Sequence, residues 1–179
     1  MTPWITQPVP FNIGQGAGVT TPSAPSLLWE NTGTGNWEYV NWLNIGNIIG
    51  ANTAVVGKTI TSIVIQLRET GTVPTQTITS YLWNSGSNPD APDFTGSTMS
   101  SASLTSSFAE YTFDFTGVDV TTSGTIVGVG MPTGVVDGSN RIDFERSSGG
   151  SVDNTNNYVG DTSSWSNKTP CMTMDIYGT

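Results

Sequence analysis

Apolar and polar residues alternate along most of the chain from Trp29 onwards. In residues 59–70, TITSIVIQLRET, the side chains of Ile63, Ile65 and Leu67 share one parity, and Ser, Val and Gln occupy the other. A period of two is typical of a strand with one buried face. No window shows sustained helical periodicity, so the pattern predicts an all-β protein.

Further stretches repeat this alternation, separated by turn signals about every 8–15 residues. Seven or eight short strands at that spacing predict an antiparallel β-sandwich of the jelly-roll type. After residues 59–70, the expected strands lie within 75–86, 110–117, 125–131, 141–147 and 171–178.

A short linker, Gly71 to Pro74, separates the first two of these strands. Two alternating runs joined by a few residues that include Gly are typical of a β-hairpin. The sequence therefore predicts that residues 59–70 and 75–86 pair with each other.

Aromatic residues form a stripe in the stretch EYTFDFTG, residues 110–117. Tyr111, Phe113 and Phe115 share one parity, while Glu110 and Asp114 lie on the other. Such stripes are usually core, because a buried aromatic side chain removes a large apolar area from water. We expect the three rings inside the sandwich and the two acids outside it. Trp83 also ends a core-type strand.

Proline marks the start of the chain as a different kind of segment. Five of the ten prolines lie in the first 25 residues, and glycines follow Ile13. Proline fixes φ and removes a backbone donor, which disfavours a place inside a sheet. The sequence predicts an extended N-terminal arm over 1–28 and a sandwich over 29–179. The arm is expected to contact the body of the protein or neighbouring subunits.

The stretch NWEYVNWLNIG, residues 36–46, carries large side chains on both parities. Trp37 and Tyr39 share one face of the expected strand, and Val40 and Trp42 share the other. We interpret it as a strand covered on both sides, in a packing or interface role. The residues expected to dock onto partners, in the arm and in this strand, are Trp4, Pro8, Pro10, Phe11, Trp37 and Trp42.

Charge is scarce and strongly acidic. Charged residues make up 11% of the chain, and the formal net charge is −9 with only five Lys and Arg. Affinity for nucleic acid comes largely from Lys and Arg that displace counterions, so a nucleic-acid partner is not expected. No apolar run approaches the ~20 residues of a membrane helix, so we expect no membrane insertion. The N-terminus also lacks the basic start and apolar core of a signal peptide.

Catalytic chemistry has few candidates. The chain has no histidine, which removes the commonest general base, and its one cysteine, Cys171, is expected to pack as a small apolar residue. Two carboxylates, Asp143 and Glu145, are the candidates for the pair of acids that a glycosidase uses. Because Ile142 and Phe144 alternate with them, we expect instead that both acids lie in solvent. The prediction is a protein without enzymatic activity.

Two Asp/Asn-rich loops are candidates for calcium, which takes carboxylate and amide oxygens at irregular spacing. The residues concerned are Asp137, Asp153 and Asn154. Asp and Asn are also common in turns, through side-chain hydrogen bonds to the backbone. We expect no cofactor, with a structural calcium ion as the alternative.

Several stretches of the chain together suggest a family. They are GKTITSIVIQLRETGTVPTQTITSYLWNSG (57–86), a Pro-bearing turn, SSFAEYTFDFTG (106–117) and the final IYG. Residues 55–179 resemble the carbohydrate-binding-module-like jelly rolls of bacterial surface proteins and of bacteriophage capsid- or tail-associated proteins. The resemblance lies in strand rhythm and turn placement. It implies binding or assembly rather than catalysis.

Three functions remain open. The first is a structural protein on the virion surface, a decoration, capsid-associated or tail-associated jelly roll that docks through its arm onto other virion proteins and copies of itself. The second is a secreted, extracellular carbohydrate-binding module, for which Trp165 and Tyr158 are the candidate glycan contacts. The third is a glycan hydrolase or lyase on the same scaffold.

Overall fold

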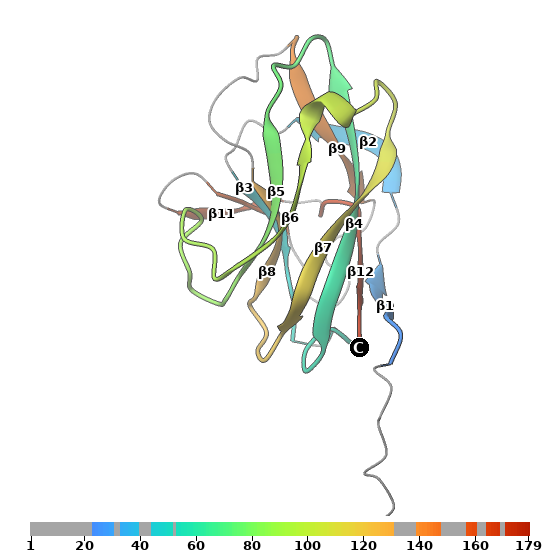
Figure 1. The fold of residues 1–179 in the computed structure, drawn as a ribbon. Helices are drawn as coiled ribbons and strands as arrows, with labels where there is room; N and C mark the ends of the chain where they lie inside the picture. Colours follow the sequence, from blue (N-terminus) through green and yellow to red (C-terminus); the bar gives the residue numbers. More distant parts are fainter. Residues whose placement is uncertain are drawn as a thin grey trace, which may run out of the picture.

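The computed structural model describes residues 23–30, 33–39, 44–51, 53–130, 139–147, 157–160, 164–168 and 171–179. These residues form twelve β-strands and one short 3₁₀ turn, and every strand pair is antiparallel (Figure 1). The prediction of an all-β antiparallel sandwich is confirmed, although the strands outnumber the seven or eight expected. None of the described residues form a helix long and apolar enough to cross a membrane.

The first sheet, sheet A, is built around the longest strand, β4. Since β12 and β7 both pair with the first half of β4, they lie on its two opposite edges. On the same edge of β4 as β12, strand β9 pairs with the last residues of β4. Strand β2 pairs with the other edge of β9. The strands of sheet A are β1 (Ser26–Glu30), β2 (Gly33–Tyr39), β4 (Thr59–Thr70), β7 (Ala109–Asp119), β9 (Arg141–Ser147) and β12 (Met174–Gly178).

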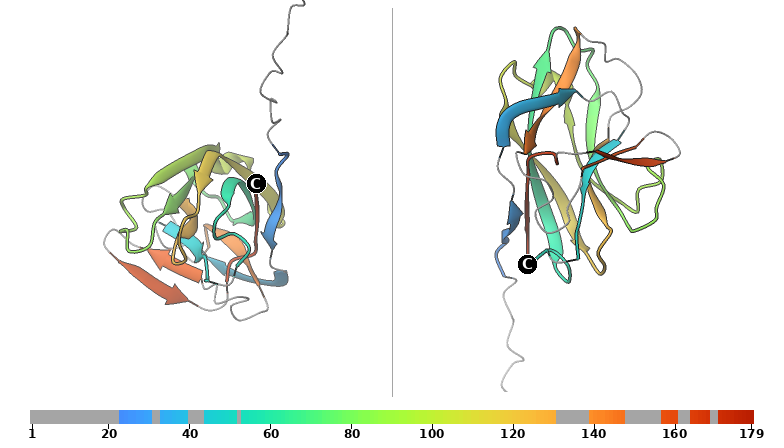
Figure 2. Two further views of the ribbon diagram at one scale, coloured as in Figure 1. Left: turned by 90° about the horizontal axis from the view of Figure 1, so that it is seen from below. Right: turned by 180° about the vertical axis from the view of Figure 1, so that it is seen from behind.

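The second sheet, sheet B, has the strand order β11-β10-β3-β8-β5-β6. Figure 2 shows the two sheets as facing layers, with β1 and β11 on opposite sides of the molecule. The strands of sheet B are β3 (Asn44–Ile48), β5 (Thr77–Trp83), β6 (Phe94–Ser100), β8 (Ile126–Gly130), β10 (Asn157–Gly160) and β11 (Trp165–Lys168). The 3₁₀ turn η1 (Ser101–Ser103) follows β6.

The predicted hairpin between residues 59–70 and 75–86 is wrong. Strand β4 pairs with β7, β9 and β12 in sheet A, whereas β5 pairs with β6 and β8 in sheet B. Residues 71–76 therefore carry the chain from one sheet to the other. The turn needs a glycine at Gly71, where φ is +74° and a Cβ atom would lie 2.1 Å from the Ser139 carbonyl oxygen. Gly and Pro mark a change of direction, but local sequence does not say which strand lies beside which.

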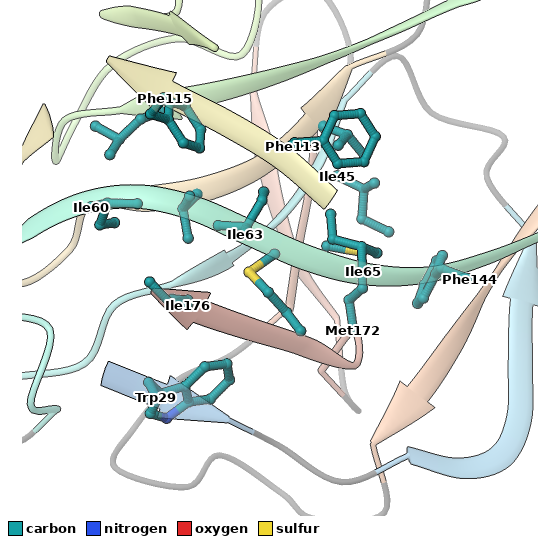
Figure 3. Packing of buried hydrophobic residues seen from close by; sticks show 14 of the residues in the cluster. Trp29, Ile45, Ile60, Ile63, Ile65, Phe113, Phe115, Phe144, Met172 and Ile176 are labelled. Atoms are coloured by element: carbon teal, nitrogen blue, oxygen red, sulfur yellow. The ribbon is translucent and has the colours of Figure 1, made fainter. Parts of the chain in front are cut away.

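The core lies between the two sheets and uses the predicted faces of the strands (Figure 3). Ile63 and Ile65 of β4 are fully buried, and they pack in one cluster with Phe113 and Phe115 of β7. Tyr111 is partly buried at the margin of this cluster. The expectation for the aromatic stripe is thus confirmed for Phe113 and Phe115, and only in part for Tyr111.

The outward parity of β7 also behaves as expected, since Glu110 and Asp114 are exposed. Cys171 is buried, in agreement with its expected packing role. Strand β1 begins at Ser26, so the last residues of the predicted arm, 26–28, belong to sheet A. Trp4, Pro8, Pro10 and Phe11, the expected docking residues of the arm, lie outside the described residues.

Candidate functional site

The carboxylates Asp143 and Glu145 are not in solvent, and that expectation is wrong. Their side chains lie on the outer face of sheet A, because Ile142 and Phe144 point into the core. Nevertheless, Asp143 has no exposed surface and Glu145 is 9% exposed. Parity predicted the face of the sheet correctly, but neighbouring side chains cover that face.

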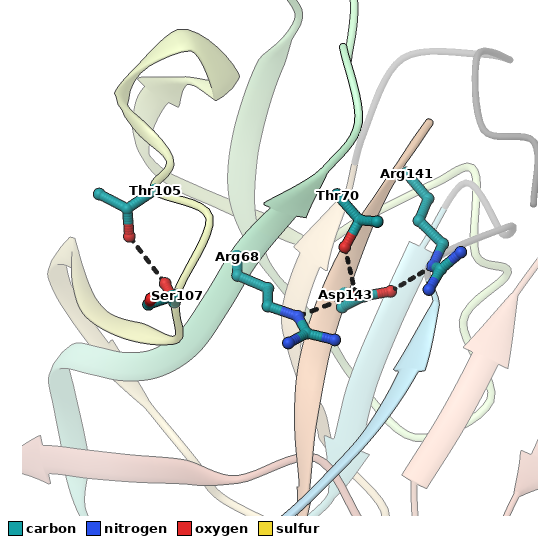
Figure 4. Close-up of polar contacts among 6 residues, drawn as sticks. All are labelled: Arg68, Thr70, Thr105, Ser107, Arg141 and Asp143. Carbon is teal, nitrogen blue, oxygen red and sulfur yellow. Dashed lines mark hydrogen bonds and ion pairs between the residues drawn. The ribbon is translucent and has the colours of Figure 1, made fainter. Parts of the chain in front are cut away.

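Asp143 is held by two arginines and a threonine (Figure 4). One carboxylate oxygen, Oδ2, accepts hydrogen bonds from Arg68 Nε and Thr70 Oγ1, both at 2.9 Å. The other, Oδ1, accepts from Arg141 Nε at 2.8 Å. The Arg68 guanidinium also lies 4.6 Å from the centre of the Phe108 ring.

This environment suits a structural role for Asp143. A general acid, base or nucleophile must reach the substrate, whereas both Asp143 oxygens are already occupied and shielded from water. Arg68 comes from β4 and Arg141 from β9, so the Arg68–Asp143 ion pair links two neighbouring strands of sheet A, and Arg141 pairs with Asp143 within β9. The arrangement holds the sheet together at its outer face.

The predicted calcium ligands Asp137, Asp153 and Asn154 lie outside the described residues. Within the described part of the chain, no group of three or more His, Cys, Asp or Glu side chains is arranged to hold a metal ion.

Three aromatic residues of sheet B, Tyr81, Trp83 and Trp165, lie close together on its outer face. Tyr81 and Trp83 of β5 point away from the core, which receives Ile78 and Leu82 of the same strand. The Trp83 ring lies 5.5 Å from the Tyr81 ring and 4.9 Å from the Trp165 ring of β11. Trp83 is fully buried in this cluster, while Tyr81 and Trp165 are partly exposed.

One row of residues crosses sheet B at the position of Trp165. Its members stand directly opposite one another on successive strands, so their Cβ positions share one face. They are Trp165, Gly160, Asn44, Gly130 and Thr79. A Cβ atom on Gly130 would lie 2.4 Å from Asn44 Oδ1 and 2.6 Å from Tyr81 Cε2. The missing side chain of Gly130 is what lets the Tyr81 ring and the Asn44 amide approach each other.

The loop 84–93, between β5 and β6, is fastened to this cluster. The carbonyl oxygen of Pro89 accepts hydrogen bonds from Trp83 Nε1 at 3.0 Å and from Asn44 Nδ2 at 2.9 Å. Trp165 Nε1 donates to the Ser87 carbonyl oxygen at 3.0 Å. The loop thus covers Trp83 and connects β5 with the β10–β11 hairpin.

Asp93 closes the same loop. Its Oδ2 accepts hydrogen bonds from the Ser87 hydroxyl and the Asn84 backbone N–H, both at 2.7 Å. These bonds, that of Ser87 first, lower the pKa of Asp93 below its ordinary value because they favour the charged carboxylate.

Two polar atoms beside the rings have open hydrogen-bonding capacity. Asn44 is 8% exposed, and its Oδ1 accepts no hydrogen bond from the residues that the structure describes. Among the described residues, the fully buried side-chain atoms that lack a hydrogen-bond partner are Trp29 Nε1 and Thr173 Oγ1. Asn44 Oδ1 also lacks a partner but is not one of these fully buried atoms, so solvent reaches it. The Tyr81 hydroxyl likewise has no described partner. We refer to Tyr81, Asn44, Gly130 and Trp165 as the Tyr81–Trp165 patch.

Sequence reasoning found this patch only in part. Trp165 is partly exposed, its ring packs against Trp83 and its indole N–H is bonded to the loop, and its role as a glycan contact stays a prediction. Tyr158 lies on β10 opposite Gly46, and nothing is described of its side chain. The parity of Tyr81, opposite to that of Ile78 and Leu82, was the signal that could have found the outer face.

The two tryptophans of NWEYVNWLNIG have different outcomes. Trp37 lies on β2, where it stands opposite Glu145 of β9, and its side chain is not described. Trp42 lies outside the described residues. The covering of both faces of this segment, and the docking role of the two residues, stay predictions.

No model of a protein family, no curated protein and no solved structure matches this chain.

Proposed function

We propose that this protein is a non-enzymatic structural component of a virus particle, a jelly roll that is displayed on the surface and docks through its N-terminal arm. The observation that carries the proposal is the order of strands β2 to β9. In sheet A these strands follow the order β2-β9-β4-β7, and in sheet B the order β3-β8-β5-β6.

Two four-stranded antiparallel sheets with this alternation support a jelly-roll topology. Jelly rolls are built from eight strands in two Greek keys, and viral capsid domains and lectins are among the proteins that use them. On this interpretation β1 and β12 extend sheet A, and the β10–β11 hairpin extends sheet B. The additions leave the eight-stranded order intact.

The chemistry of the described residues favours assembly over catalysis. Asp143, the most enclosed carboxylate, is neutralised by Arg68 and Arg141. The net charge of −9 gives the domain an acidic surface that suits a soluble, displayed protein.

The position of β1 supports docking through the arm. This strand is the edge of sheet A and pairs only with β12 among the described strands. An arm that precedes this strand would join the domain at the edge of sheet A. Many copies on one particle would gain strength through avidity, even where each contact is weak.

The test is to ask where the protein resides. An antibody raised against the full chain is used to probe density-gradient fractions of particles purified from the source culture. We expect the protein to co-sediment with intact particles and the antibody to decorate their surface in electron micrographs. A protein found only in the particle-free fractions would refute the proposal.

A further inference from the structure

The Tyr81–Trp165 patch is a preformed surface with unused binding capacity. Its two partly exposed rings, Tyr81 and Trp165, each lie about 5 Å from the Trp83 ring, measured between ring centres. Near Tyr81, Asn44 Oδ1 is an open acceptor, and the Tyr81 hydroxyl is an open donor and acceptor. None of the four residues is charged, so the patch suits a neutral ligand with apolar rings and backbone-like polar groups.

Rigidity is built into the patch by its surroundings. Asn44 is fixed by Pro89 of the loop, and Trp165 by Ser87. Because these side chains are already ordered, a ligand that binds here loses little affinity to the ordering of the protein.

One segment of the chain has matching chemistry. The first charged side chain in the sequence is that of Glu30, so residues 1–22 carry no charged side chain in a chain of net charge −9. The same residues include Pro3, Pro8, Pro10 and the aromatic Phe11. Proline-rich segments favour the polyproline II conformation, in which carbonyl groups remain open to partners.

The proline content of residues 1–22 favours binding to an aromatic surface over pairing with an open strand edge. Strand addition to an open edge such as β1 requires regularly spaced backbone N–H donors, and Pro8 and Pro10 have none. Aromatic surfaces with a few polar side chains are, in contrast, a recurring way to recognise proline-rich segments. Proline rings pack on the aromatic faces while the open carbonyl groups accept hydrogen bonds from side chains.

We propose that the Tyr81–Trp165 patch of one copy binds the Pro-rich segment 1–22 of a neighbouring copy. The inference rests on the proposed docking role of the arm and names its receiving site. The Tyr81 hydroxyl donates to a carbonyl of the bound segment, and Asn44 Oδ1 accepts from one of its amide groups.

We assign the bound segment to a neighbouring copy because the arm and the patch belong to different parts of the domain. Strand β1 is at the edge of sheet A, whereas the patch is on the outer face of sheet B (Figures 1 and 2). At about 3.1 Å per residue, 22 residues in the polyproline II conformation reach roughly 70 Å, enough to extend beyond their own domain. The contact is head to tail, the type that builds rings or arrays.

The experiment measures self-association of the full chain by sedimentation velocity over a range of concentrations. The test variants are Tyr81→Ala in the patch and Trp4→Ala with Pro8→Ala and Pro10→Ala in the arm. We expect each to weaken self-association by roughly tenfold or more, as the loss of an anchoring aromatic contact does. Tyr81→Phe keeps the ring and is expected to lose less. A synthetic peptide of residues 1–22 should dissociate the wild-type assemblies.

Phe94→Ala is the matched control, because Phe94 is an exposed ring on the same sheet, 41% exposed, outside the patch. It should associate as the wild type does. Circular dichroism and thermal melting of every variant show whether it is folded, and Tyr81→Phe covers the case in which Tyr81→Ala unfolds.

Three results would overturn the inference. If the arm variants lose association but Tyr81→Ala and Tyr81→Phe do not, the arm docks elsewhere, and the proposed function stands alone. If the wild type stays monomeric while the arm variants shift the assigned NMR signal of the Trp165 indole N–H, the arm binds its own domain. If neutral oligosaccharides shift that signal and the peptide does not, the patch is a sugar site.

Discussion

Asp143 shows how a charged side chain can be buried on the outer face of a sheet. Its three hydrogen bonds come from Arg68, Thr70 and Arg141, so charge and acceptor capacity are both satisfied. Removing one member of a buried ion pair is costly because the partners are left uncompensated.

We therefore predict that Asp143→Ala lowers the free energy of unfolding by about 2–4 kcal/mol, somewhat less than a fully buried pair because Arg68 and Arg141 keep some exposure. Urea denaturation followed by circular dichroism measures the loss. Asp114→Ala, an exposed acid on β7, is the control and should change little. A loss for Asp143→Ala as small as that of the control would mean that the ion pairs contribute nothing.

Asn47 is a second buried polar residue with a structural role. It is fully buried on β3, and its amide pairs with both backbone groups of Met172, donating to the carbonyl oxygen at 2.9 Å and accepting from the N–H at 3.2 Å. Asn47 therefore connects sheet B to the segment that leads into β12 of sheet A.

Asn47→Ala should lower the free energy of unfolding by about 2–5 kcal/mol, because it removes two buried hydrogen bonds to the backbone of Met172 and opens a cavity. Asn47→Asp retains the acceptor only and should also be destabilising. Asn88→Ala, at an exposed position, serves as the control in the same denaturation experiment. Equal midpoints for Asn47→Ala and Asn88→Ala would argue against a link between the sheets.

At the scale of elements, the loop 84–93 depends on Asp93. The hydrogen bonds from Ser87 and Asn84 place the folded-state pKa of Asp93 below its ordinary value of 3.8. A group of this kind stabilises the folded loop fully above the unfolded pKa, and the contribution disappears as pH falls through the folded pKa.

We predict that amide protection of residues 84–93 falls below about pH 3.8 in the wild type, as measured by hydrogen exchange corrected for intrinsic rates. Asp93→Asn should have low protection at every pH, because the amide cannot replace the charged acceptor. Asp90→Asn, in the same loop and exposed, should behave as the wild type. Protection that is independent of pH in the wild type would exclude the Asp93 closure.

The elements also show what the sequence could and could not predict. Alternation identified the buried residues of β4 and β7 correctly, since the inward parity depends only on local geometry. The partners of β4 and β5 were not predictable, because a Gly/Pro linker is compatible with a hairpin and with a crossing between sheets. Residues 26–28 of strand β1 were predicted as arm, because the pairing of β1 depends on β12, far away in the sequence.

The candidate site was less predictable than the fold for the same reason. Trp165 was recognised by its polar surroundings in the sequence, but Asn44, Tyr81 and Gly130 come from three different strands. Their meeting depends on the strand order of sheet B. Solvent exposure of Asp143 was mispredicted because parity gives the face of a sheet and not what covers that face.

At the scale of the whole molecule, part of the acidic balance is expressed as repulsion between three acids of sheet A. Asp175 of β12 stands opposite Glu30 of β1, and Glu110 of β7 contributes to the same field. Burial raises the pKa of Asp175 above its ordinary value, and repulsion from Glu30 and Glu110 adds to that effect.

Since the folded-state pKa of Asp175 is raised, its charged form opposes folding at neutral pH, and the penalty is relieved as pH falls towards its unfolded value of 3.8. We therefore predict that Asp175→Asn raises the melting temperature at pH 7 and that the gain shrinks as the pH approaches that value. The gain should also fall as salt is added, because screening weakens the repulsion from Glu30 and Glu110. Asp119→Asn is the contrasting variant, because Asp119 accepts a hydrogen bond from Thr59, and it should not stabilise. A melting temperature for Asp175→Asn at or below that of the wild type at pH 7 would show that this face tolerates its charge through contacts other than those described.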